Sequence, residues 1–147
     1  MAETSSESLA SHPAPHRSRV GLGALLFGLF AAPIFWSGHE MTNYGLANHF
    51  CFPGAVPLTT APGEAGWLWP LMLAFDVITL AVIAAAGWLA YRNWRVAREE
   101  AAGHHEALLD VGEGRTRFLG LCGMLFSLLF FGATVFDLIA LFLEPLC

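Results

Sequence analysis

Residues 67–91 read WLWPLMLAFDVITLAVIAAAGWLAY, a run in which Asp76 is the one charged residue. A helix needs about 20 predominantly apolar residues to cross the hydrocarbon core of a bilayer. Two further apolar blocks lie on either side of this run, at residues 20–36 and 118–143. Three such blocks separated by polar segments predict an all-α membrane protein with three transmembrane helices.

The composition agrees with a membrane protein. The chain has 147 residues, of which 56% are hydrophobic and 13% charged, and its mean hydropathy is +0.57. Such values argue against a soluble enzyme. All seven basic residues are arginine and the net charge is −5, without a basic cluster that has interleaved aromatics. We therefore expect membrane lipid, and not nucleic acid, around this chain.

The polar segments divide the chain. Residues 1–19 are rich in Ser, Ala, Pro and Glu, so we expect them to form a disordered cytoplasmic tail. Residues 20–147 are expected to form one transmembrane domain. The first helix is expected to continue beyond its apolar block, with Pro33 as a possible kink. The predicted helices are residues 20–48, 67–91 and 118–143.

The arginines predict an orientation. Two precede the first helix, five fall between the second and third helices, and the first loop has none. The positive-inside rule then puts the N-terminus inside and the C-terminus outside, as for a multi-pass protein of a bacterial inner membrane. The arginines are Arg17, Arg19, Arg92, Arg95, Arg98, Arg115 and Arg117.

Four ionisable residues lie within the predicted helices, and each needs a reason because a charge in a span costs about 2.5–3.5 kcal/mol. Counted from the arginines at about 1.5 Å per residue, all four reach one level near the outer interface. One explanation is a site that binds a metal or exchanges protons. The other is a structural knot in which the carboxylates accept hydrogen bonds from Trp, Tyr44, Asn43 or backbone donors. The four residues are His39, Glu40, Asp76 and Asp137.

Small residues at helical spacing predict where the helices approach each other, since close approach drives helix association in lipid. These stripes contain Ala24, Gly28 and Ala32 on the first helix, Ala81 and Ala85 on the second, and Gly123 and Ser127 on the third.

Two of the three cysteines, Cys51 and Cys147, follow helices on the predicted outer side, whereas Cys122 begins a helix on the inner side and is expected to pack as a small apolar residue. An oxidising exterior favours a disulfide between the outer pair. Free thiols are an alternative, and so is copper. No cofactor is otherwise expected. The copper ligands would be His39, His49, Cys51 and Cys147. The pair His104 and His105 with Glu106 is expected in a solvated loop.

The residues Trp36, His39, Tyr44 and Cys51, spaced W-x2-H-x4-Y-x6-C, resemble a motif of small bacterial three-helix membrane proteins encoded beside haem–copper terminal oxidases. The third helix and the ending Pro145-Leu146-Cys147 share this resemblance, which spans roughly residues 20 to 147. It implies an accessory or assembly role at an oxidase. The four motif residues and Cys147 would be the shared positions, without an established activity.

Three functions are consistent with the sequence. The first is a non-enzymatic accessory subunit or assembly factor of an inner-membrane respiratory complex. Neighbouring genes for oxidase subunits would favour this function. The second is an outer-face protein for copper handling or thiol redox chemistry. The third is an oligomeric transporter or channel that would use Asp76 and Asp137 around a pore.

Overall fold

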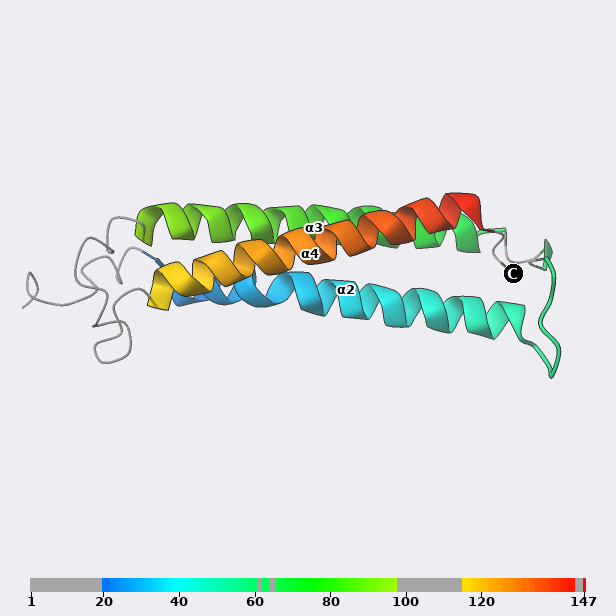
Figure 1. Cartoon of the computed structure of the whole chain (residues 1–147). Coiled ribbons are helices and arrows are strands. Elements are labelled where there is room, and N and C mark those ends of the chain that lie inside the picture. Colours follow the sequence, from blue (N-terminus) through cyan, green and yellow to red (C-terminus); the bar gives the residue numbers. More distant parts are fainter. Residues whose placement is uncertain (1–19, 61, 64–65, 98–114, 145–146) are drawn as a thin grey trace, which may run out of the picture.

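The computed structural model describes residues 20–60, 62–63, 66–97, 115–144 and 147, and these form an antiparallel bundle of three helices (Figure 1). The described residues contain no strand. All three helices are long and apolar enough to cross a membrane, as the sequence predicts. The helices are α2 (Leu22–Cys51), α3 (Leu68–Ala97) and α4 (Arg115–Leu143).

The helices extend beyond the predicted bounds at their polar ends. α2 continues to Cys51, where the Phe52 N–H donates to the carbonyl of Asn48 and Pro53 follows. α3 continues past Tyr91 because its arginines are compatible with helix and lie over aromatic rings. The Arg92 guanidinium lies 5.9 Å from the Trp88 ring centre, and that of Arg95 lies 5.9 Å from the Tyr91 ring centre.

Small residues hold the helices together at the arginine end, the end of the bundle where α2 starts, α3 stops and α4 starts. A Cβ added to Gly123 of α4 would lie 2.6 Å from the Gly28 carbonyl oxygen of α2, and one added to Gly28 would lie 3.3 Å from Ala90 of α3. A Cβ on Gly120 would lie 3.2 Å from the Trp94 backbone. Backbone therefore packs against backbone here, as small residues permit in membranes.

The predicted stripes are correct for α2 and α4 and wrong for α3. Gly28, Ala32, Gly123 and Ser127 are buried, but Ala81 and Ala85 are exposed. The reason is that α3 turns its polar residues away from lipid, and this fixes which face is buried. Every third or fourth residue of α3 is inside, a period near 3.5 that suits packing along a seam. The buried residues are Leu68, Met72, Asp76, Thr79, Ile83, Ala86, Ala90, Asn93 and Ala97.

Rings and a cysteine pair join the helices at the cysteine end, the opposite end of the bundle. There α4 has crossed obliquely towards the start of α3 (Figure 1). Trp69 Nε1 donates to the Leu141 carbonyl at 3.3 Å, and the Trp69 and Phe142 ring centres are 5.3 Å apart. The Sγ atoms of Cys51 and Cys147 lie at disulfide distance, 1.98 Å, across a separation of 96 residues. These contacts tie the end of α2 to the chain end that follows α4.

Candidate functional site

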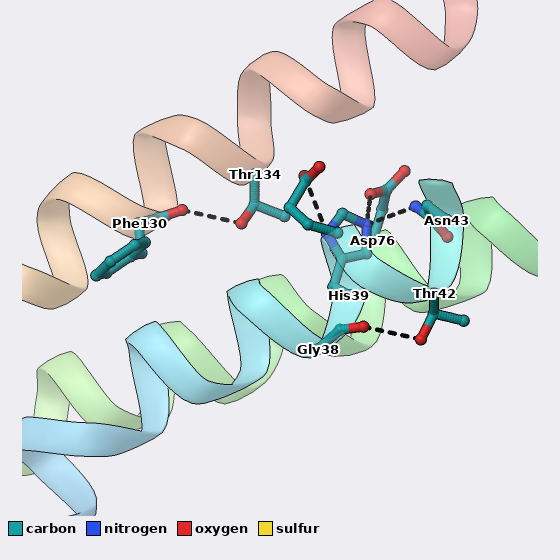
Figure 2. Close-up of polar contacts among 8 residues, drawn as sticks. Gly38, His39, Thr42, Asn43, Asp76, Phe130 and Thr134 are labelled. Atoms are coloured by element: carbon teal, nitrogen blue, oxygen red, sulfur yellow. Dashed lines mark hydrogen bonds and ion pairs between the residues drawn. The ribbon is translucent and has the colours of Figure 1, made fainter. Parts of the chain in front are cut away.

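Each helix contributes an ionisable side chain to one cluster near the cysteine end, which we call the polar cluster: His39 and Glu40 of α2, Asp76 of α3 and Asp137 of α4. Figure 2 shows its centre, with His39 pointing from α2 towards α3. The side chains of His39 and Asp76 are each only 1% exposed. Two such buried polar groups from different helices fix how α2 and α3 are rotated relative to each other.

The closest contact of the cluster joins His39 Nε2 to Asp76 Oδ1 at 2.6 Å. Asn43, one helical turn beyond His39, puts its Nδ2 2.7 Å from the same ring nitrogen. A protonated Nε2 facing Asp76 cannot accept from the Asn43 amide N–H, and both Asn43 Oδ1 and Asp76 Oδ1 are buried without a hydrogen-bond partner. Turning that amide over would place its oxygen, an acceptor, next to Nε2.

The other ring nitrogen of His39 is buried and has no hydrogen-bond partner among the described residues. Glu40 Oε1 lies 3.6 Å from this Nδ1, beyond hydrogen-bond length. One donor atom each of His39, Glu40 and Asp137 lie within 4.8 Å of one another. Asp137 Oδ2 is also buried without a hydrogen-bond partner. The cluster thus contains unused donor and acceptor capacity at its centre.

Two neighbouring hydroxyl groups, of Thr134 and Thr42, do not hydrogen-bond to the polar cluster. Thr134 of α4 is fully buried, but its hydroxyl donates to the Phe130 carbonyl of its own helix at 2.9 Å (Figure 2). Thr42 likewise donates to the Gly38 carbonyl at 2.8 Å. Both hydroxyls are satisfied within their own helices, so they do not compete for His39 or the carboxylates.

A pocket of about 210 Å³ opens beside the cluster. It is lined by His39, Glu40, Asp76 and Asp137 together with Glu144, the residue just after α4. Because Glu144 is exposed at the cysteine end, the pocket leads from the cluster towards that end of the bundle. A small ion or water can therefore reach the buried side chains.

Trp, Tyr44, Asn43 or backbone donors are expected to hydrogen-bond to the carboxylates. In the structure the side chain that contacts Asp76 and Glu40 is His39. Tyr44 is 73% exposed and points away from the bundle interior. The Trp36 ring packs against Phe130, with ring centres 5.1 Å apart, and its Nε1 has no hydrogen-bond partner. The four-residue spacing of His39 and Asn43 puts both side chains on one helix face. This spacing is the sequence signal for the contact between them.

The alternative copper ligands are not brought together. Cys51 and Cys147 lie against each other, and His49 is exposed with its ring against Phe50 at 5.1 Å. Among the described residues, the group of three or more possible ligands that meets is His39, Glu40 and Asp137. Cys122 is half-buried in α4. The tail of residues 1–19 and the segment with His104, His105 and Glu106 lie outside the described residues.

The charge of the cluster is unbalanced. The sequence has no Lys or Arg between Arg19 and Arg92, and none after Arg117. Among the described residues, Arg92, Arg95 and Arg117 lie at the arginine end, and none of them is at the level of the three carboxyl groups. His39 is the one basic side chain that contacts them in the described structure. Three carboxyl groups within membrane-spanning helices share this one basic side chain, so the arrangement favours the binding of a cation or of protons.

Comparison of the chain with protein-family models, with curated proteins and with solved structures finds no match. The resemblance to the three-helix group encoded beside terminal oxidases therefore stays a prediction based on Trp36, His39, Tyr44 and Cys51. The geometry of the described residues is the remaining basis for a function.

Proposed function

We propose that this chain is a non-enzymatic accessory subunit or assembly factor of a larger respiratory complex in a bacterial inner membrane, with terminal oxidase subunits as its partners. The observation that carries the proposal is a set of glycines without neighbours. Gly38 and Gly45 of α2 have no atom within 4 Å of an added Cβ, unlike Gly28 and Gly123. Small residues on a lipid-facing helix surface are what a second helix needs for close approach.

Gly38 of α2 borders a groove that we propose accommodates a helix. A space of about 370 Å³ lies between α2 and α3, and Gly38 and Thr42 line it on the α2 side. Phe75 and Ile78 line it on the α3 side. Because the Thr42 hydroxyl is bonded to its own helix, the groove is largely apolar. A transmembrane helix of a partner protein is the occupant we propose.

Size supports a non-enzymatic role. The segments between the helices, residues 52–67 and 98–114, are short, and neither is long enough for a catalytic domain. Three helices are also few for a transport path within one copy. Binding to other membrane helices requires only the exposed surfaces that the bundle has.

Leucine at Gly38 or Gly45 tests this function. Each substitution fills open space, so the bundle should remain folded while a helix can no longer approach α2. Co-purification of oxidase subunits with the tagged chain, from membranes solubilised in mild detergent, is expected to fall at least tenfold. The matched control is Gly132→Leu on α4, which also meets no atom. A tagged chain that purifies alone, together with normal oxidase assembly in a deletion strain, would refute the proposal.

The arginines and the cysteine pair support one orientation, with the N-terminus in the cytoplasm and the cysteine end outside. Arginine-bearing ends stay inside, and disulfides form in oxidising compartments. Reporter fusions after Cys147 should be active when exported, and fusions at Gly103 should be active in the cytoplasm. Cytoplasmic activity at Cys147 would overturn the orientation.

A thiol-redox role is a second candidate, favoured by a pocket of about 490 Å³ beside the cysteine pair. Tyr44, Asn48, Cys51 and Cys147 line this pocket, so a partner thiol could approach the sulfurs. A redox role predicts reduction of the pair by mild thiols and reoxidation during turnover, whereas structural disulfides resist the glutathione pool. Copper handling through these thiolates would require the pair to be reduced first.

A further inference from the structure

We propose that His39, Glu40 and Asp137 bind one divalent transition-metal ion inside the transmembrane bundle, with Asp76 as the residue that orients His39. This role is separate from docking to a partner. It is argued from the donor geometry, the unpartnered histidine nitrogen and the charge of the cluster.

The donor atoms are close to the spacing of a metal site. One atom each of His39, Glu40 and Asp137 lie within 4.8 Å of one another. Ligands at about 2.1 Å from a tetrahedral ion are about 3.4 Å apart, so closure requires movements of roughly 1 Å. Glu40 and Asp137 are both partly exposed and have rotatable side chains that permit this movement. The ligands come from α2 and α4, and the ion would therefore link these helices.

His39 is held in the orientation of a metal ligand. A ligating histidine usually donates its second ring N–H to a carboxylate, which fixes the tautomer and the ring plane. Asp76 Oδ1, 2.6 Å from His39 Nε2, has this position. The opposite nitrogen, Nδ1, is buried in a side chain that is 1% exposed, lacks a hydrogen-bond partner and faces Glu40 at 3.6 Å. No described hydrogen bond involves a lone pair on His39 Nδ1, so this nitrogen can ligate an ion.

The charges and donor types narrow the class of ion. Three carboxyl groups meet one imidazole, and the described arginines Arg92, Arg95 and Arg117 lie at the other end of the bundle. One nitrogen and two oxygens suit Zn²⁺, Mn²⁺ or Fe²⁺, whereas Cu(I) prefers thiolate and thioether sulfur. The pocket towards Glu144 leaves room for water as a further ligand. An open coordination position of this kind is typical of sites that exchange ligands.

Zinc binding to the purified full chain tests the proposal. Protein in mild detergent is stripped with a chelator, loaded with Zn²⁺, separated from free metal and measured by elemental analysis. The measured quantity is the number of zinc ions bound per chain. It is compared between the unsubstituted chain and its Asp137→Asn and Glu40→Gln variants, because histidines elsewhere also bind zinc. We expect one Zn²⁺ per chain to be lost in both variants. Asp76→Asn should weaken the affinity about 10- to 100-fold without abolishing the site.

Glu144→Gln is the matched control, since Glu144 lines the same pocket outside the donor set and should keep the zinc. X-ray absorption should show nitrogen and oxygen ligands and no sulfur. Each variant must elute as the unsubstituted chain does and retain its helical circular dichroism. Equal zinc in the chain and both ligand variants would overturn the proposal. Zinc-free protein with infrared bands of protonated Glu40 or Asp137 would overturn it as well, and would show that the cluster holds protons.

Discussion

The arginine end and the cysteine end of the bundle are held together by different means. At the arginine end Gly28, Gly123 and Ala90 bring the three backbones into direct contact. At the cysteine end the contacts include the polar cluster, an apolar core around Leu68 and Met72, the ring of Trp69 and the Cys51–Cys147 pair. Both pockets that border His39 lie in this second half.

The difference follows from the absence of a hydrophobic driving force between helices in lipid. Where glycines allow contact, many small van der Waals terms stabilise the bundle. At the cysteine end, polar contacts between helices and a disulfide add to the packing of larger apolar side chains such as Leu68 and Met72. A site for an ion or a partner requires space, so the cysteine half, and not the arginine half, is where function is expected.

The largest effect is expected from Gly123→Leu, which attacks the close packing of the arginine end. A Cβ there would lie 2.6 Å from the Gly28 carbonyl oxygen, a backbone atom that cannot rotate away. We expect a loss of about 3 kcal/mol or more in the free energy of unfolding. Unfolding in mixed detergent and SDS, followed by circular dichroism, measures it.

Gly132→Leu is the matched control for this prediction, because the same residue on the same helix meets open space. Its effect should stay within about 0.5 kcal/mol. Equal unfolding midpoints for Gly123→Leu and the unsubstituted chain would show that the arginine end does not depend on backbone contact. The contrast between the two ends would then be wrong.

The number of helices and the level of the polar groups could be predicted from the sequence. Apolar runs report helices directly, and counting at about 1.5 Å per residue from the arginines places His39, Asp76 and Asp137 at one depth. Depth along an axis depends only on the helical rise. It needs no knowledge of how the helices pack.

The rotation of each helix about its axis could not be predicted in the same way. Ala81 and Ala85 have the spacing of a packing stripe, yet they face outward while Ala86 and Ala90 are buried. Small residues occur on several faces of α3, so composition alone does not choose among them. Asp76 does choose, because its carboxyl group has to avoid lipid. The contact between Asp76 and His39 also requires that α2 turn His39 towards α3, and this is known only from the structure.

An intermediate effect is expected from removing the covalent link at the cysteine end. The pair closes a segment of 96 residues, and a disulfide of this kind typically contributes 2–4 kcal/mol. Since the membrane already confines the unfolded helices, we expect about 2 kcal/mol for Cys51→Ser or Cys147→Ser. SDS unfolding without reductant measures it, with Cys122→Ala as the control.

Thiol labelling checks the premise of that prediction. Without reductant, denatured protein should be modified at Cys122 alone, and after reduction at all three cysteines. Labelling of three thiols in unreduced protein isolated from its native membrane would contradict the disulfide. The cysteine end would then be held by noncovalent contacts only.

The smallest effect is expected from Trp69→Phe, which removes one hydrogen bond between α3 and α4. The indole N–H donates to the Leu141 carbonyl at 3.3 Å, slightly longer than an ideal bond, and Trp69 is 37% exposed. Phenylalanine keeps a ring against Phe142, so the loss should be only about 0.5 kcal/mol. The matched control is Trp88→Phe at the arginine end, where the ring is 60% exposed and borders Arg92. If Trp88→Phe destabilised the bundle more than Trp69→Phe, interhelical polar contacts would not distinguish the cysteine end. A larger loss for Trp69→Phe would show that single directional contacts matter at the cysteine end.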